Sequence, residues 1–298
     1  QNGKKVTVFV ELKARFDEEN NLATAELMEK AGIHIIYSIP GLKVHAKVAL
    51  ILRCHKDGRP KKSFAYISTG NFNEKTATVY ADSALFTSNE ELVEDLSNLF
   101  RLLRKEITEP QFKRLWVPRF NLLPELKRRI GLEANMALDG KKAHIILKMN
   151  ALQDPAMIDE LYRASEAGVQ IELIVRGICC LKPNQPYSKN IRITRIVDSF
   201  LEHARVWYFH NGGKPLVYMG SPDWMKRNLY RCIEAVTPIL DSKLKQEMID
   251  MLHIQLADNQ KAGWVNEKLQ NIRKHDPHAM PVRSQYAFYE YLKEKNER

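Results

Sequence analysis

The sequence predicts an α/β protein made of two domains related by an internal repeat, each with a mixed sheet flanked by helices. Short segments with the apolar pattern of β-strands alternate with amphipathic segments typical of helices. The same chemical landmarks also occur in the same order in both halves. With 298 residues, the chain is long enough to give each half a hydrophobic core of its own.

Four segments of the first half have strand patterns: residues 4–12, 33–39, 43–53 and 63–73. One segment, residues 20–32, has a clear helix pattern. Gly32 stands just past the helix, where glycine is common. Asp57-Gly58 predicts a hairpin turn. Two further amphipathic segments, residues 89–107 and 122–138, predict helices separated by a break. We therefore expect a first domain over residues 1–116, truncated at its N-terminus, and a second over residues 117–298.

The second half repeats this organisation. A helix pattern at residues 156–168 is followed by strand patterns at residues 169–180, 190–200, 201–213 and 215–224. The region from residue 241 to the end is predicted to be mostly helical.

Three kinds of landmark mark the repeat. They are an arginine late in a strand (Arg15 and Arg176), a histidine followed two residues later by a cation (His45 with Lys47, His203 with Arg205) and a small-residue loop (residues 70–73 and 220–223). A histidine on one face of a strand is commonly an ordinary hydrogen-bonded residue. Its recurrence with a cation at the same spacing favours a functional role instead.

The repeated cations predict an anion-binding site. If the halves pack across a pseudo-two-fold axis, the two histidines and their basic neighbours meet in one cleft. Such a cluster is costly without an anion to neutralise it, and guanidinium and ammonium groups suit phosphate oxygens. An imidazole can attack phosphorus or transfer a proton. The pattern therefore indicates phosphoryl transfer, with one histidine as nucleophile and the other as acid or base.

Composition limits the partners. The formal charge of +10 is typical of proteins that bind nucleic acid, an anionic membrane surface or a phosphate-rich substrate. No apolar run is long enough to cross a bilayer. The four cysteines show no CxxC spacing, which argues against a structural zinc site and favours a reducing, cytoplasmic setting. The basic segment within residues 101–107 is interpreted as a solvated helix face, so nucleic acid is not expected as a partner.

The His-x-Lys motif followed by a Gly-Ser-x-Asn type loop resembles the phospholipase D superfamily. One element departs from that pattern, because the acidic residue expected seven positions after each histidine is replaced by Leu52 and His210. The carboxylates that orient the imidazoles must then come from elsewhere. Asp82 and Glu234, which follow the two loops, are the candidates; the alternative is that both are solvated surface acids.

A closer resemblance is to the polyphosphate kinases, ATP–polyphosphate phosphotransferases. It is carried by VELKARFDEENN, GLKVHAKVALI, STGNFNEKTATVYAD, LIVRGICCLKP, RIVDSFLEHARV, MGSPDWMKRNL and EAVTPI, from about Val8 to Ile239. Family members are longer, so the chain resembles their C-terminal catalytic half, which consists of two phospholipase D-like domains. The resemblance implies a homo-oligomer for the full-length protein and weak or no activity for the isolated fragment.

The resemblance also implies roles for individual residues. His45 matches the autophosphorylated histidine, and His203 the second essential histidine. Tyr80, Arg176 and His203 match residues assigned to ATP, and Arg15 matches one assigned to the Mg²⁺–phosphate site. Because a guanidinium has no lone pair for a metal, we expect Arg15 to hold phosphates that in turn hold Mg²⁺. We further expect phosphate contacts from Lys47, Arg205, Asn71, Asn73 and Ser221.

The expected reaction is reversible transfer of the ATP γ-phosphate to polyphosphate through phosphohistidine. The alternatives are a phospholipase D-like phosphodiesterase or nuclease, in which water attacks the intermediate, and a polyanion-binding module without activity. ATP, ADP and polyphosphate are the expected ligands, Mg²⁺ is the expected cofactor, and peripheral association with a membrane is compatible with the charge.

Overall fold

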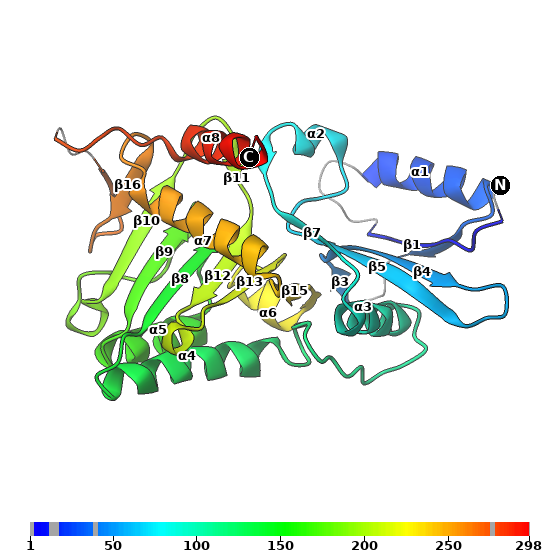
Figure 1. Ribbon diagram of the computed structural model, residues 1–298, viewed down its shortest axis with the longest axis horizontal. Helices are drawn as coiled ribbons and strands as arrows, with labels where there is room; N and C mark the ends of the chain where they lie inside the picture. Colours follow the sequence, from blue (N-terminus) through cyan, green and yellow to red (C-terminus); the bar gives the residue numbers. More distant parts are fainter. Residues whose placement is uncertain (1–2, 12–17, 38–40, 275–277, 298) are drawn as a thin grey trace.

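Two α/β halves lie side by side in the computed structural model, which describes residues 3–11, 18–37, 41–274 and 278–297. The smaller half is N-terminal, and the larger contains a wide mixed sheet (Figure 1). The mixed α/β architecture agrees with the fold class predicted from the sequence.

The first half is built on two small sheets. β1 (Thr7–Val10) pairs in parallel with β2 (His34–Tyr37), and α1 (Glu18–Lys30) connects them. β4 (Lys47–Cys54), β5 (Pro60–Ser68) and β7 (Ala84–Thr87) form an antiparallel sheet in the order β4-β5-β7. One face of this sheet packs on α3 (Glu90–Leu103) through Ala65, Ile67, Leu96 and Leu99, all nearly inaccessible to solvent. The predicted hairpin at Asp57-Gly58 joins β4 to β5.

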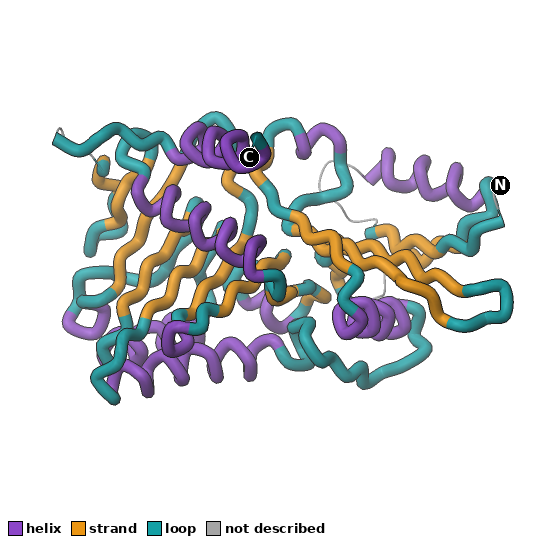
Figure 2. The backbone as a smooth tube through the Cα atoms, in the orientation of Figure 1, coloured by secondary structure: helices purple, strands orange, loops and turns teal. Residues whose placement is uncertain are grey.

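The second half is a sandwich of helix, sheet and helix. Its eight strands run in the order β15-β13-β12-β8-β9-β10-β16-β17. These strands are β8 (His144–Met149), β9 (Gln170–Val175), β10 (Ile191–Ile196), β12 (Arg205–Phe209), β13 (Leu216–Gly220), β15 (Val236–Pro238), β16 (Ala262–Val265) and β17 (Asn271–Arg273). Helices cover both faces, with α7 (Ser242–Ala257) on one and α4 (Leu122–Leu138) and α5 (Pro155–Glu166) on the other (Figure 2).

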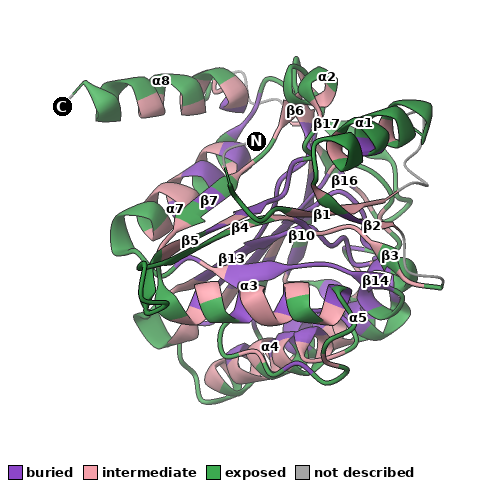
Figure 3. Cartoon of the chain, turned by 90° about the vertical axis from the view of Figure 1, so that its right-hand side faces the viewer, coloured by how far each residue is buried: buried purple, intermediate pink, exposed green. Residues whose placement is uncertain are grey.

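The central strands are buried on both faces, which explains their continuous apolar sequences. In β8, Ile145 and Leu147 join the core beneath α4 and α5, whereas Ile146 joins the core beneath α7. Figure 3 shows this purple interior against the green outer surfaces of the helices.

Four very short strands connect the halves. β3 (Lys43–Val44) pairs in parallel with β14 (Cys232–Ile233), and β6 (Tyr80–Ala81) pairs in parallel with β11 (Leu201–Glu202). The remaining elements are α2 (Glu74–Ala77), α6 (Lys226–Tyr230), α8 (Ser284–Asn296) and the short 3₁₀ helices Pro186–Ser188 and Asn211–Gly213.

The connection between α3 and α4 is fixed by one buried carboxylate. Asp95 accepts hydrogen bonds from the backbone N–H groups of Lys113, Arg114 and Leu115, at 2.7–2.8 Å. Trp116 then pairs with Val236 in an isolated antiparallel bridge. The domain boundary predicted at residue 116 falls within this connection.

The prediction of a mostly helical C-terminal region was incomplete. Between α7 and α8, β16 and β17 extend the large sheet, with Trp264 opposite Thr194 of β10. These strands are only four and three residues long. Their pairing with β10, a contact between segments distant in the chain, decides the strand conformation that local sequence leaves open.

Gly220→Ala is expected to lower the free energy of unfolding by about 1–3 kcal/mol, because a new Cβ would lie 2.6 Å from the carbonyl oxygen of Ala235. Gly131→Ala within α4 is the matched control, since a Cβ added there would meet no heavy atom within 4 Å. The control should be neutral or stabilising by up to ~1 kcal/mol. Urea denaturation measures both, and equal stability of the two variants would contradict the prediction.

Candidate active site

The pairing of β3 with β14 places His45 beside its carboxylate partner. The N–H groups of His45 and Ala46 both donate to the carbonyl of Ile233, at 2.8 and 3.1 Å. The next residue, Glu234, places Oε2 2.8 Å from Nδ1 of His45. Glu234 is fully buried, whereas the side chain of His45 is 31% exposed. The imidazole is thus anchored at one nitrogen and accessible to a substrate.

His203 is held in the same way, but here the histidine comes from the second half and the carboxylate from the first. The N–H groups of His203 and Ala204 donate to the carbonyl of Ala81, at 3.0 and 3.1 Å. Asp82 follows, and its Oδ1 lies 2.7 Å from Nδ1 of His203. Each half therefore supplies a histidine to a carboxylate of the other half.

Charge and burial shift the pKa values of these groups. Burial alone would raise the pKa of Glu234, but His45 and Lys47 outweigh it and lower the pKa to about 2. Burial also opposes ionisation of Asp82, yet hydrogen bonds from His203 and Thr69 bring its pKa below the ordinary value. The pKa of His203 is lowered, because loss of solvent outweighs the attraction of Asp82. Both carboxylates are ionised at neutral pH.

The cation two residues after each histidine has an equivalent contact in both halves. Lys47 Nζ donates to the carbonyl of His45 at 2.6 Å, and Arg205 Nη1 donates to the carbonyl of His203 at 2.7 Å. Arg205 also pairs with Asp223 through Nη2 at 2.9 Å. Burial is the main cause that lowers the pKa of Lys47 to about 8, and the charges of Glu234, Arg205 and Asp82 also act on it. Lys47 is thus within electrostatic reach of both histidine–carboxylate pairs.

The small-residue loops support the two carboxylates. Thr69 Oγ1 donates to Asp82 at 2.6 Å, and the Thr69 N–H donates to the carbonyl of Ser83 at 3.0 Å. In the other half the Ser221 N–H donates to the carbonyl of Ala235 at 3.1 Å. Ser221 is fully buried and contacts Glu234. The Ser221 hydroxyl therefore supports Glu234 from the buried side of the site and is not exposed for the phosphate contact that the sequence analysis expected.

The register of the two loops differs from the sequence alignment, which matched residues 70–73 with 220–223. Lys47 lies opposite Ser68 in β5, and Arg205 lies opposite Gly220 in β13. Residues 68–71 are therefore the equivalents of 220–223. The alignment was wrong by two residues, because it matched Gly70 with Gly220. The strand pairing shows that Gly70 is equivalent to Pro222.

Gly70 is needed at its position for a different reason. A Cβ there would lie 2.6 Å from Oδ2 of Asp82. The absence of a side chain at Gly70 thus makes room for the carboxylate that holds His203.

The predicted ATP residues Tyr80 and Arg176 lie beside His203. The Tyr80 ring is centred 4.8 Å from the imidazole. Arg176 Nε donates to the carbonyl of Glu202 at 2.7 Å and to Asn150 Oδ1 at 3.3 Å. Burial, followed by the nearby charge of Arg205, lowers the pKa of Arg176.

The two predicted asparagines have different environments. Asn71 is exposed. Asn73 caps α2, with Oδ1 accepting from the Thr76 N–H at 3.0 Å. The predicted phosphate ligand Arg15 lies outside the described residues.

Several residues that support the site were absent from the sequence-based prediction, among them Asn228, which donates to Oε1 of Glu234 at 2.6 Å. Asn150 donates to the carbonyl of His203 at 3.3 Å, and Thr69 and Glu202 act through the contacts above. No motif marks Asn150, which meets His203 only in the folded chain, whereas Glu202 directly precedes His203 in the quoted stretch RIVDSFLEHARV but no local pattern predicts its contacts. Thr69 is adjacent to the quoted loop, and the strand register would have been needed to find it.

The described residues do not provide a protein-only metal site. No group of three or more His, Cys, Asp or Glu side chains among them is arranged to hold a metal ion. Nor does any helix in the described part of the chain combine the length and apolarity needed to cross a membrane.

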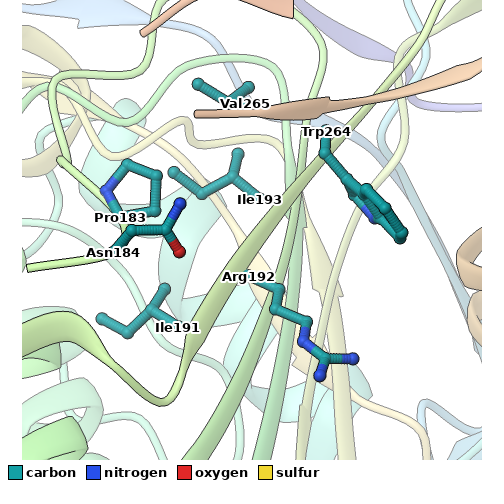
Figure 4. A pocket seen from close by; sticks show the side chains of 7 residues that line it. All are labelled: Pro183, Asn184, Ile191, Arg192, Ile193, Trp264 and Val265. Atoms are coloured by element: carbon teal, nitrogen blue, oxygen red, sulfur yellow. The ribbon is translucent and has the colours of Figure 1, made fainter. Parts of the chain in front are cut away.

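A separate pocket of about 320 Å³ lies at the far edge of the large sheet (Figure 4). It is lined by Pro183, Asn184, Ile191, Arg192, Ile193, Trp264 and Val265. None of these residues belongs to the histidine–carboxylate pairs, so the pocket is distinct from the candidate active site.

The paired α/β halves agree with the fold class predicted from the sequence, that of phospholipase D-like domains. A phosphatidylserine synthase from Haemophilus influenzae has this fold at a TM-score of 0.53 and 11% identity, with 99% of this chain and 89% of that one covered. At this identity the likeness shows the fold alone.

Within that class, the chain belongs to the polyphosphate kinase family. Residues 1–109 match polyphosphate kinase C-terminal domain 1, and residues 115–285 match C-terminal domain 2. The polyphosphate kinase of Porphyromonas gingivalis superposes with a TM-score of 0.92 at 53% identity, covering 99% of this chain and 45% of that chain. The family resemblance inferred from the sequence is thereby confirmed.

Curated relatives agree with this assignment. A polyphosphate kinase from Halalkalibacterium halodurans is 45% identical over 97% of this chain and 41% of its own length. One from Vibrio cholerae is 44% identical over 98% of this chain and 42% of its own length. The chain thus spans about two fifths of the length of these relatives.

Lys47→Met is expected to raise the melting temperature at pH 7, because the buried ammonium is less stable in the folded protein than in water. With a folded-state pKa of about 8, this destabilisation is fully present below pH 8 and disappears as the pH rises toward the ordinary value of 10.5. The difference from wild type should therefore shrink between pH 8 and 10.5. The exposed Lys61→Met is the control in thermal melts. A difference that stays constant over this pH range would count against the predicted burial cost.

Proposed function

We propose that this chain is the catalytic portion of an ATP–polyphosphate phosphotransferase that acts through a phosphohistidine on His45. The observation that carries the proposal is the exchange of histidine–carboxylate pairs between the halves, with Lys47 within electrostatic reach of both. Membership of the polyphosphate kinase family supports the choice of substrates. ATP, ADP and polyphosphate are accordingly the proposed ligands.

His45 is the proposed nucleophile because it is the more exposed of the two imidazoles, at 31% against 11% for His203. Glu234 accepts a hydrogen bond from the Nδ1–H group of His45, which leaves the lone pair of Nε2 free. Nε2 attacks the γ-phosphorus of ATP, forming a P–N bond. The bond from phosphorus to the bridging oxygen breaks, and its electron pair leaves with ADP.

His203 is proposed to assist the leaving oxygen. Because its pKa is lowered, the imidazole of His203 is neutral in the free enzyme at neutral pH. The negative charge of bound ATP would favour the protonated imidazolium. Asp82 accepts from Nδ1, so the proton on Nε2 can be donated to the departing ADP oxygen. In the second step a terminal polyphosphate oxygen attacks phosphorus, and the P–N electron pair returns to His45.

The basic residues stabilise charge on the transferring phosphoryl group. Lys47, Arg176 and Arg205 are proposed to contact its equatorial oxygens, and Asn71 is a neutral donor at the exposed end of its loop. The family resemblance supports Mg²⁺ as the companion of the nucleotide. Since the described side chains form no metal cage, Mg²⁺ would be held by substrate phosphates, and no step above depends on it.

We also propose an assembly state and a location for the full-length protein. A homo-oligomer and a cytoplasmic location are proposed for the full-length protein from the family resemblance and the cysteine pattern. Peripheral membrane contact is proposed from the charge of +10 alone. The isolated chain is proposed to have weak or no synthase activity, since it spans about two fifths of its relatives.

His45→Ala is expected to abolish incorporation of an acid-labile phosphate from γ-labelled ATP, because the proposed nucleophile, Nε2 of His45, is removed. The experiment uses the longest form of the protein that contains this chain, and mass spectrometry locates the phosphate. His34→Ala is the matched control, because His34 is exposed on β2 and lies outside the histidine–carboxylate pairs. Undiminished labelling of His45→Ala would overturn the proposal.

A second measurement separates transfer from hydrolysis. Wild-type protein should consume ATP and extend polyphosphate while leaving bis-p-nitrophenyl phosphate intact. Rapid cleavage of the diester without phosphate transfer would assign the chain to the phosphodiesterases instead.

A further inference from the structure

The segment just before His203 is held from the outside by the start of α8. Arg283 binds Asp198 through Nε at 2.9 Å and Nη2 at 2.6 Å, and Nη2 also donates to Ser199 at 2.8 Å. The side chain of Asp198 is only 1% exposed. This bidentate ion pair fixes the beginning of the segment from residue 198 to residue 202.

Gln285 fixes the end of the same segment. Its amide exchanges two hydrogen bonds with the backbone of Phe200, at 2.8 and 3.0 Å. Its Nε2 also donates to Oε1 of Glu202 at 2.8 Å. The residue after Glu202 is His203, so one side chain of α8 reaches to within one residue of the proposed acid.

Glu202 is the centre of a buried polar cluster. It is 5% exposed and pairs with Lys148, which is 2% exposed. Gln255 of α7 donates to its Oε2 at 3.0 Å. Burial alone would raise the pKa of Glu202, but Lys148 and the hydrogen bonds from Gln285 and Gln255 outweigh this and lower it. A carboxylate so enclosed has few alternative positions.

The backbone of Glu202 contacts the nucleotide end of the site. Its carbonyl accepts from Arg176 Nε at 2.7 Å, and its strand, β11, pairs with Tyr80 and Ala81. A displacement of Glu202 would therefore move Arg176, His203 and the ribbon that brings His203 to Asp82.

The start of α8 is itself rigidly placed, although the helix extends away from the sheet and is exposed along much of its length (Figure 3). Ser284 donates from its N–H at 2.8 Å and its hydroxyl at 2.7 Å to Asp258, at the end of α7. Asp258 is fully buried. The distal half of α8 is attached separately, through Lys295 to Glu247 and Tyr291 to Asp250.

We propose that Gln285 and Arg283 are positioning residues, which hold the segment from residue 198 to residue 202 so that Arg176 and His203 meet the nucleotide in productive geometry. This inference rests on the proposed function. α8 thereby does more than cover the core, because its first turn sets the position of catalytic groups contributed by other elements. Both residues are proposed to act through their contacts with residues 198–202 rather than on the substrate.

Gln285→Ala is expected to reduce kcat/KM for ATP about tenfold, the effect of losing ~1.4 kcal/mol of supporting hydrogen bonds. Lys295→Ala, which removes an ion pair from the same helix, is the matched control and should change kcat/KM less than twofold. Both are assayed in the longest form of the protein that contains this chain, with thermal melts as a check on folding. A loss equal in both variants would reduce α8 to a structural role and overturn the inference.

Gln285→Glu provides a readout that a purely structural role would not move. At high pH the new carboxylate would repel Glu202, whereas at lower pH the protonated carboxyl can donate the missing hydrogen bond. The charged groups that face this position are Glu202 from β11, Lys148 from β8 and, two residues away, the Arg283–Asp198 pair. The ratio of variant to wild-type kcat/KM should therefore rise severalfold as the pH falls from 8 to 6.

Two different results would overturn the positioning role, and only one of them overturns the proposed function. If wild-type protein is labelled at His45 but the Gln285→Glu ratio is independent of pH, the positioning role is wrong and the proposed function stands. If wild-type protein is neither labelled nor active with ATP, the proposed function itself fails, and the positioning role fails with it.

Discussion

The structure depends on two pairs of backbone hydrogen bonds that cross between the halves. The carbonyl of Ile233 accepts from two successive N–H groups at His45, and the carbonyl of Ala81 does the same at His203. Each carbonyl is followed by the carboxylate that holds the imidazole. Placement of the side chains is therefore set by main-chain geometry, which has far fewer degrees of freedom than the long side chains around it.

This arrangement makes each half incomplete without the other. A histidine whose orienting carboxylate lies in the opposite half cannot be held correctly by one domain alone. The apolar cores of the two halves contribute stability, but the site lies where they join. Strain or displacement at that junction should therefore disturb the histidine–carboxylate pairs before it affects either core.

The site also concentrates polar and charged groups that are costly to bury. Lys47, Arg205 and Glu234 are each less than a tenth exposed, and each has partners of opposite charge or carbonyl oxygens. Such networks stabilise one geometry only when every member is satisfied. Among the described side chains at the site, the cations Lys47, Arg176 and Arg205 are balanced by three carboxylates, Asp82, Asp223 and Glu234.

The sequence by itself determined the repeated α/β organisation, the His45 and His203 motifs and the family, because strand periodicity and short spacings are local properties. It also singled out Asp82 and Glu234 as the candidates for orienting carboxylates. Only the tertiary structure decided that the pairs are crossed, that Ser68 rather than Gly70 lies opposite Lys47, and that β16 and β17 join the sheet. These features depend on pairing between residues far apart in the chain, and no pattern within a short segment encodes which distant partner a strand or carboxylate will meet.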